Sequence, residues 1–439
     1  MPYIELDSNV NVPLLDDGSA NVQPTSVKSA AHVTNDTMPL RRKKYLVILI
    51  SLGIFASFVA IIHLLINAPA FNQYKILRAY QNQIDNEVAE KGRSGRPRTI
   101  LLWNSFFEDK RWGLSEDSMG PNYFRDEFNC HEYRCDLTNN RDFLPTIEMF
   151  DAVLFHTAQP FPLLQPVPRR RSPHQQYVFA LMEPPGETKH VLTDEAGFYN
   201  MTMSYRLDSD IMWPYQYFED IETGELVAPA VHAKWRQVPV EWNETSVSQV
   251  WEGKTRMAAW FVSHCETLSK REKLAAALQE YIDVDIYGKC GNLSCPRSSN
   301  ECDRLLDVRY KFYFSFENSL CNDYVTEKLY NAMRRNVIPV VFGAADYSRF
   351  VPPNSVINAE DFQNVAELAS HLQYVATHPE EYMRYFWWRR YYRLSYRSPF
   401  CDLCEKLHSI TNSQKTQTYL NIEKWWMGDQ CRFESKIKF

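Results

Sequence analysis

The sequence predicts an α/β protein with parallel sheets, and two observations support this fold class. Near-continuous apolar runs of strand length recur along the chain, and stretches with helical periodicity separate them. Such runs are typical of parallel strands that helices bury on both faces. The chain beyond residue 97 is about 340 residues long, which exceeds one comfortable core and favours two domains. The predicted strands cover residues 99–103, 152–156, 177–182, 257–262, 282–286, 312–316 and 337–342.

The first 97 residues contain a candidate membrane anchor. Residues 45–66 carry no charged side chain and are long enough to cross a bilayer as one helix. A basic run, 41–44, precedes them, so the positive-inside rule places the tail 1–44 in the cytosol and the rest in the lumen. A cleaved signal peptide is the alternative, with Ala68-Pro69-Ala70 as its cleavage site. We favour an uncleaved signal-anchor, because the apolar segment and the region before it are both longer than in signal peptides.

The luminal part is expected to begin with a largely polar stem, 67–97. All ten cysteines and three N-glycosylation sequons, at Asn200, Asn243 and Asn292, lie beyond the membrane segment. This placement agrees with an oxidising compartment, where disulfides are expected. The sequence leaves the disulfide connectivity open.

A zinc site is the alternative for some of these cysteines. Cys401, Cys404, His408 and Cys431 have the donor atoms of a Cys3His site. We expect disulfides instead, since they are the default in an oxidising compartment.

A polar stretch at 240–253 separates the first three predicted strands from the last four. We therefore predict one domain over 98–245, a second over 246–375, and a C-terminal segment, 376–439, that packs back on the domains. The aromatic and basic run 385–393 is predicted as a helix of that segment. Nucleic-acid binding is not expected, because the net charge is −6.

The stretch 311–343 is the most informative part of the chain, and it reads as strand, polar turn, helix and strand. Asn322 and Asp323 suit a helix N-cap. Val325, Leu329 and Met333 follow at helical spacing and predict one buried face. Glu327 and Lys328 then fall in the first helical turn, beside the strand end. Open α/β sheets bind phosphorylated ligands at this position.

Two further strand ends carry groups suited to the same chemistry. Glu183 follows strand 177–182 and precedes Pro184-Pro185-Gly186, so it projects from a strand end as a candidate general base. Arg271 follows strand 257–262, from where a guanidinium can make a bidentate contact with a diphosphate. Asp283-Val284-Asp285 looks like a metal-binding pair, but its alternation with apolar residues suits a strand, so we predict no metal ligands.

The strings FSFENS, DYVTEKLYNA and VIPVVFGA in 311–343 resemble the signature of the α1,3/4-fucosyltransferases, glycosyltransferase family 10. The resemblance implies a GT-B-like fold, with two Rossmann-like domains facing a cleft, and GDP-fucose as the donor substrate. It implies no bound organic cofactor, and Mn²⁺ or Mg²⁺ often assists such enzymes by neutralising diphosphate charge.

The resemblance also implies roles for individual residues. Glu183 matches the general base of the family. Glu327 is the second catalytic carboxylate, which would stabilise positive charge at the anomeric carbon. The implied donor-binding residues are Arg271, Asn318, Tyr324 and Lys328.

The function implied is inverting transfer of L-fucose from GDP-β-L-fucose, in α1,3 linkage, by a type II protein of the Golgi membrane. Cys401-Asp402-Leu403-Cys404 resembles the C-terminal Cys-x-x-Cys of invertebrate and plant core-type enzymes. The expected acceptor is therefore the innermost GlcNAc of N-glycans on glycoproteins. A Lewis-type enzyme acting on terminal N-acetyllactosamine is the alternative. An inactive, membrane-anchored glycan-binding protein on the same fold is the alternative from another class.

Overall fold

The computed structural model describes residues 96–439, apart from a set of short gaps, and these residues belong to one compact unit. The gaps are 115–122, 159–167, 169, 189–191, 193–194, 240–249, 252, 296–299 and 411–416. The predicted tail, the membrane segment 45–66, nearly all of the stem and the sequon at Asn243 lie outside the described residues. No helix within the described residues combines the length and the apolar character of a membrane span.

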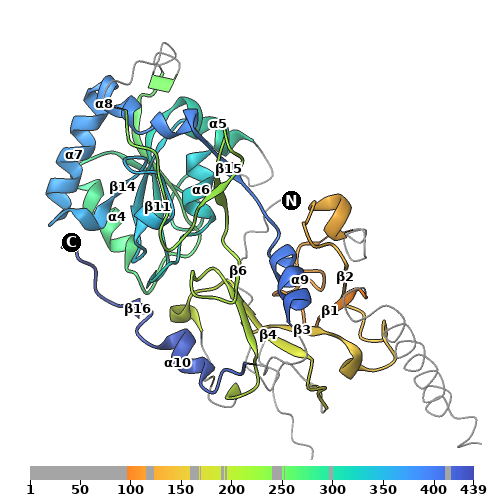
Figure 1. The fold of residues 1–439 in the computed structure, drawn as a ribbon. Coiled ribbons are helices and arrows are strands. Elements are labelled where there is room, and N and C mark those ends of the chain that lie inside the picture. Colours follow the sequence, from red (N-terminus) through yellow and green to blue (C-terminus); the bar gives the residue numbers. More distant parts are fainter. Residues whose placement is uncertain are drawn as a thin grey trace, which may run out of the picture. The chain divides into compact units, whose positions relative to one another are not determined.

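A six-stranded parallel sheet occupies the N-terminal half of the described chain, and all three strands predicted there are confirmed (Figure 1). Its strand order is β2-β1-β3-β4-β5-β6, so the order reverses between β1 and β3. The strands are β1 (Arg98–Leu102), β2 (Cys135–Thr138), β3 (Ala152–His156), β4 (Gln176–Leu181), β5 (Met201–Ser204) and β6 (Ile211–Met212).

A five-stranded parallel sheet follows, and the four strands predicted for this half are confirmed within it. Its order is β10-β9-β11-β13-β14, so the reversal lies between β9 and β11. The strands are β9 (Arg256–Phe261), β10 (Val284–Tyr287), β11 (Tyr310–Phe316), β13 (Ile338–Phe342) and β14 (Ile357–Asn358). The chain is thus an α/β protein with parallel sheets, while the domain limits set between 245 and 246 stay a prediction.

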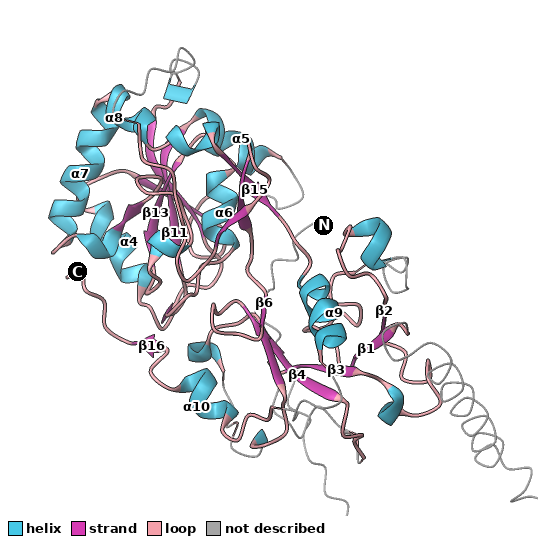
Figure 2. Cartoon of the chain, viewed as in Figure 1, coloured by secondary structure: helices cyan, strands magenta, loops and turns pink. Residues whose placement is uncertain are grey.

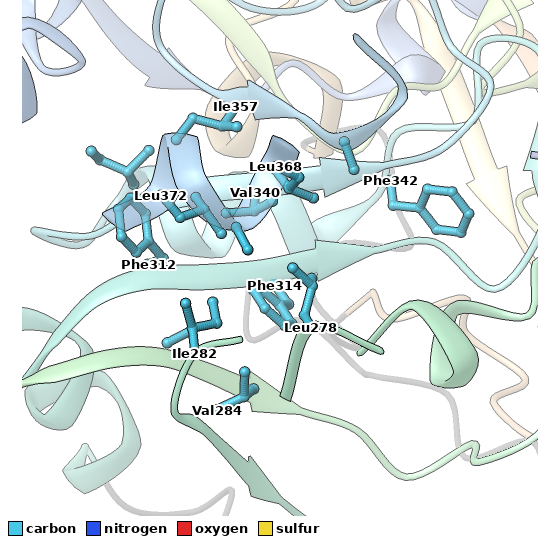
Figure 3. Close-up of a cluster of buried hydrophobic side chains, with 14 of the residues drawn as sticks. Leu278, Ile282, Val284, Phe312, Phe314, Val340, Phe342, Ile357, Leu368 and Leu372 are labelled. Carbon is cyan, nitrogen blue, oxygen red and sulfur yellow. The ribbon is translucent and has the colours of Figure 1, made fainter. Parts of the chain in front are cut away.

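Helices cover both faces of the five-stranded sheet, because its strands are apolar on both sides. Phe312, Phe314 and Phe316 of β11 face one core. Figure 3 shows Phe312 and Phe314 in this core, beside Leu368 and Leu372 of the covering helix. Tyr313, one residue out of phase, faces the other core. The first face packs against α4 (Arg271–Gln279) and α7 (Val365–Thr377), and the second against α5 (Glu301–Val308) and α6 (Glu327–Met333), with α8 (Pro379–Arg384) after α7.

The six-stranded sheet takes its covering helices from the far end of the chain. Phe400, Leu403 and Leu407 of α9 (Pro399–Ser409) pack on one face of that sheet. Ile422 and Trp426 of α10 (Ile422–Met427) pack on the other face. The C-terminal segment therefore completes the N-terminal core, and Figure 2 shows both helices beside the strands.

The helix predicted over 385–393 is wrong. Residues Trp387–Arg390 form one short 3-10 turn, and the chain then extends as β15 (Tyr392–Ser395). Strand β15 pairs antiparallel with β7 (Tyr217–Asp220), which also pairs with β8 (Leu226–Ala228). Pairing with a distant strand overrides the local preference of this aromatic run, because aromatic residues suit strands as well.

Five disulfides use all ten cysteines, and no cysteine is free. Cys130–Cys401 and Cys135–Cys404 fasten α9 to the six-stranded sheet, and Cys321–Cys431 joins β12 (Leu320–Cys321) to β16 (Cys431–Arg432). The remaining bonds are Cys265–Cys290 and Cys295–Cys302. The zinc alternative is therefore wrong, since Cys401, Cys404 and Cys431 each bond to a different cysteine.

The glycosylation predicted at Asn200 does not fit this fold. Asn200 is buried, its Oδ1 accepts a hydrogen bond from the Tyr177 amide at 2.9 Å, and its Nδ2 donates to the Gln417 carbonyl at 2.8 Å. Because the oxygen and the nitrogen of this buried amide both make hydrogen bonds inside the protein, the side chain has no room for a glycan. Asn292 is exposed, and its glycosylation stays a prediction.

We expect Leu372→Ala to lower the free energy of unfolding by about 2 to 5 kcal/mol, because Leu372 is fully buried between α7 and the five-stranded sheet. Chemical denaturation of a soluble fragment would measure it. Tyr374→Ala on the same helix is the matched control, since Tyr374 is exposed, and should change stability by about 0.5 kcal/mol at most. Equal losses in the two variants would contradict the assigned core.

Candidate active site

The loops that follow β9 and β11 meet at the carboxyl ends of these strands, where the strand order reverses. The Ser269 amide donates to the Asn318 carbonyl at 3.0 Å, and the Ser269 hydroxyl donates to the Glu317 carbonyl at 2.7 Å. Sheets of this order bind ligands at such a reversal. The two hydrogen bonds hold the two loops together there.

Lys328 is the cation at the centre of this region. Its Nζ lies 2.9 Å from the Thr326 hydroxyl, 3.1 Å from Glu327 Oε1 and 3.2 Å from Glu317 Oε2. Burial alone would lower the pKa of the Lys328 ammonium, but Glu317 and Glu327 hold that pKa above its usual value. The group is therefore a fixed positive charge at this edge of the sheet.

Glu183 comes from the other sheet, directly after β4, and it is half-buried. Burial raises the pKa of its carboxyl to about 7, with Lys328 lowering it and Glu327 raising it. These mutual effects place the three charged groups in one electrostatic neighbourhood. A carboxyl with a pKa near neutrality is suited to accept a proton from a hydroxyl.

The turn after Glu183 contacts both loops of the five-stranded sheet. It forms the short 3-10 turn Pro185–Glu187, and a Cβ added to Gly186 would lie 3.1 Å from Leu268 Cδ1 and 3.1 Å from Ser319 Oγ. The Tyr215 hydroxyl also donates to the Met182 carbonyl, at 3.3 Å, just before Glu183. The turn after Glu183 is thus held against the loops that precede α4 and α6.

Arg271 is buried beneath these loops and is held there by backbone carbonyls. It begins α4, and its Nη1 donates to the Phe316 carbonyl at 2.7 Å while its Nη2 donates to the His264 carbonyl at 3.2 Å. Each terminal nitrogen uses one of its two N–H groups on a backbone oxygen, and the buried Nε has no partner among the described residues, so the expected contact with a diphosphate stays a prediction. Arg271 ties together the chain segments that follow β9 and β11 and adds a positive charge at this edge of the sheet.

Asn318 and Ser319 each carry a buried polar side-chain atom that makes no hydrogen bond with the described residues. These atoms are Asn318 Oδ1 and Ser319 Oγ. Buried polar atoms without partners are costly, and sites that bind polar ligands commonly hold them. Asn318 is therefore well placed for the donor-binding role expected of it.

Tyr324 lies between the two halves of the site. It is buried, and its ring centroid is 5.0 Å from that of Tyr205, which follows β5 of the six-stranded sheet. Burial raises the pKa of Tyr324 well above its usual value. The ring packs the junction of the two halves, where Asp323 also accepts a hydrogen bond from the Leu207 amide at 3.2 Å.

The helix start predicted at Asn322 and Asp323 is wrong by one turn. The N-cap of α6 is Thr326, whose hydroxyl accepts from the Lys328 amide. Asp323 has φ 58°, outside the helical region. The pairing of β12 with β16 ends at Cys321, and Asn322 and Asp323 form a turn before the helix. Glu327 and Lys328 do begin the helix, as expected.

Sequence reasoning missed the role of Glu317. This side chain is 1% exposed and contacts both Thr326 and Lys328. The signal available was its place directly after β11, at the same strand end as the residues that were selected. Burial raises the pKa of the Glu317 carboxyl, against the attraction of Lys328.

Of the pair Asp283 and Asp285, the structure places Asp285 in a strand, whereas Asp283 directly precedes β10. Asp285 lies in β10 and accepts hydrogen bonds from Arg256 Nε, at 3.0 Å, and from the Tyr310 hydroxyl, at 2.6 Å. Within the described part of the chain, the one group spaced for a shared metal ion is Cys135, Cys404 and His408. Its two cysteines, Cys135 and Cys404, form a disulfide with each other, so neither offers a thiolate to a metal ion.

The sequence matches two family models. Residues 95–216 match the model described as fucosyltransferase, N-terminal, and residues 251–425 match glycosyltransferase family 10 (fucosyltransferase), C-term. The chain is also 52% identical over 394 residues to α-(1,3)-fucosyltransferase C of Drosophila melanogaster, across 90% of each protein. It is 34% identical to glycoprotein 3-α-L-fucosyltransferase A of the same species, across 76% of this chain and 61% of that one.

Among solved structures, an α1,3-fucosyltransferase with GDP-fucose superposes with a TM-score of 0.42 at 17% identity, across 79% of this chain and 88% of that one. The two family models and the relative at 52% identity are sufficient to show the family of this chain. The chain belongs to the fucosyltransferases of glycosyltransferase family 10 and is an enzyme.

Proposed function

We propose that this enzyme transfers L-fucose from GDP-β-L-fucose, in α1,3 linkage and with inversion, to the innermost GlcNAc of N-glycans on glycoproteins. The observation that carries the proposal is that the turn after Glu183 packs on the loops before α4 and α6, the helix that begins with Glu327 and Lys328, and that the charges of Lys328 and Glu327 act on the Glu183 carboxyl. A base, a cation and a second carboxylate at one crevice match the needs of a sugar-nucleotide transferase.

Each group has one task in a single displacement. Glu183 accepts the proton of the acceptor hydroxyl as its oxygen attacks the anomeric carbon opposite the phosphate. Lys328 stabilises the charge on the departing diphosphate, and Glu327 stabilises positive charge on the sugar. The bond to the phosphate breaks as the bond to the acceptor forms, so a β-linked donor gives an α-linked product without a covalent intermediate.

A divalent cation, Mn²⁺ or Mg²⁺, is proposed to stimulate the enzyme. The carboxylates at the crevice fit an auxiliary role for it, because Glu317 and Glu327 are already engaged by Lys328. The ion would supply extra neutralisation of diphosphate charge. Asn318 and Lys328 bind the donor in either case.

The acceptor assignment rests on two features. The Cys-x-x-Cys at 401–404 resembles that of core-type enzymes, and in this structure it fastens α9 to the sheet that carries Glu183. The name of the relative at 34% identity says that it acts on glycoproteins. A Lewis-type activity on terminal N-acetyllactosamine is the competing proposal.

The architecture proposed is GT-B-like, with two Rossmann-like domains around the donor and acceptor crevice. Two parallel sheets, each with one reversal of strand order, support it. We also propose a type II protein of the Golgi membrane, anchored by residues 45–66. The uncharged segment and its basic N-terminal flank support the anchor, and the five disulfides agree with an oxidising lumen.

Glu183→Gln is expected to lower kcat about 100-fold or more, because an amide accepts no proton. With a base pKa of about 7, wild-type kcat/KM should fall as the pH drops below 7, where the carboxyl is protonated. The assay is GDP release from GDP-fucose with an N-glycan acceptor. Glu187→Gln, in the same turn, is the control and should retain activity. Full activity of Glu183→Gln would exclude Glu183 as the base.

Gly186→Ala should lower kcat/KM about tenfold without unfolding the protein. The new methyl group presses on Leu268 and Ser319 and shifts the turn that holds Glu183, and small displacements of a catalytic group are costly. Adding Leu268→Ala removes one of the two contacts and should restore part of the activity. Unchanged kinetics in Gly186→Ala would show that the contact of Gly186 with Leu268 and Ser319 does not align the base.

A panel of defined acceptors tests the substrate assignment. N-glycans with an unmodified innermost GlcNAc should accept fucose, whereas free N-acetyllactosamine should not, as measured by mass spectrometry of the products. Transfer to N-acetyllactosamine alone would replace the core assignment with the Lewis-type one. No turnover by wild type or Glu183→Gln with any acceptor would favour the inactive glycan-binding alternative.

A further inference from the structure

Glu317 makes a dense set of contacts for a buried carboxylate. Its Oε1 accepts hydrogen bonds from the Thr326 amide at 2.9 Å and from the Thr326 hydroxyl at 2.9 Å. Its Oε2 lies 3.0 Å from the same hydroxyl and 3.2 Å from Lys328 Nζ. A charged group with 1% exposure is expensive to bury, and an ion pair of this kind is weak evidence for a contribution to stability.

Thr326 connects this carboxylate to the start of α6. Its hydroxyl oxygen accepts from the Lys328 amide at 3.5 Å, as the helix cap, and from Lys328 Nζ at 2.9 Å. The same hydroxyl has one hydrogen to donate, and Glu317 is its acceptor. Glu317 therefore fixes the rotation of the threonine hydroxyl, so that its lone pairs face Lys328.

Glu327 holds Lys328 less firmly. It shares one contact with the ammonium, at 3.1 Å, and its side chain is 15% exposed, against 2% for that of Glu317. The only other described partner of the ammonium is Thr326. The direction of the Lys328 side chain is thus set mainly by Glu317 and Thr326.

We propose that Glu317 is a positioning residue that, together with Thr326, aims the Lys328 ammonium at the diphosphate of the donor. This inference rests on the proposed function and deepens it, since it concerns the same donor site. Glu317 does not touch the donor and acts through Lys328.

Glu317→Gln separates positioning from simple electrostatics. The change removes a negative charge beside a site for an anion, so charge alone predicts equal or tighter binding of GDP. Positioning predicts weaker binding of GDP. The glutamine side chain would turn an N–H group toward the Lys328 ammonium, which would then lose its acceptor and its fixed direction. We expect the Kd for GDP, measured by calorimetry, and the KM for GDP-fucose to rise about fivefold or more, with a smaller change in kcat. An unchanged or lowered KM and Kd would overturn the proposal.

Glu360→Gln is the matched control for loss of a buried ion pair. Glu360 lies after β14, is 9% exposed and pairs with Arg432 at 2.6 Å. It should lose stability as Glu317→Gln does but keep the wild-type Kd for GDP. A raised Kd in both variants would mean that general loosening, and not positioning, explains the effect.

Thr326 provides a second test that does not require Glu317→Gln to fold. Thr326→Ser keeps the hydroxyl and should have a near-wild-type KM for GDP-fucose, whereas Thr326→Val should raise it about fivefold. The double variant Glu317→Gln/Thr326→Val should be no worse than the poorer single variant, because both act on one unit. A wild-type KM in Thr326→Val overturns the proposal. If wild type itself neither binds GDP nor uses GDP-fucose, the proposed function fails first.

Discussion

Strand β11 is paired on both sides by parallel neighbours, β9 and β13, and the site depends on this pairing. The register sends Phe312, Phe314 and Phe316 into one core and carries Glu317 to the carboxyl edge beside the loop after β9. Ser269 and Arg271 can then bridge the two loops with hydrogen bonds to backbone carbonyls. A slip of one residue would turn Glu317 away from Thr326 and place a phenylalanine at the crevice.

The two halves of the site are joined by packing as well as by charge. Tyr324 and Cys321, from the loop after β11, lie in the same apolar cluster as Phe179 and Trp426 of the other half. Trp426 in turn donates to the Thr188 hydroxyl at 2.9 Å, just beyond the turn that follows Glu183. The turn after Glu183, the proposed base, is therefore supported by α10 on one side and by the loops after β9 and β11 on the other, which suits a reaction that needs two substrates aligned.

Much of this arrangement could be predicted from the sequence. The seven apolar runs are strands, and Glu183, Glu327 and Lys328 stand at strand ends or helix starts, because local hydrophobic pattern determines such features. The strand β15, the cap at Thr326 and the buried Asn200 could not be predicted in this way. Strand β15 and the buried Asn200 depend on partners far along the chain, β7 and Gln417, and the cap at Thr326 depends on a side-chain contact with Glu317, which hydrophobic pattern does not reveal. Arg271 illustrates the same limit, since its acceptors are backbone carbonyls that no side-chain pattern reveals.

The covering of the six-stranded sheet by α9 and α10 has a consequence for biosynthesis. The N-terminal strands emerge first, but both of their faces stay without these helices until nearly the whole chain has been made. Cys130 and Cys135 likewise precede their partners by 271 and 269 residues. While the chain is growing, the nearest thiol available to each of them is the other one, so an incorrect bond between them must be avoided or later exchanged. The N-terminal half therefore cannot complete its core and its disulfides by itself. The six-stranded sheet reaches its final structure only after the last forty residues have been synthesised.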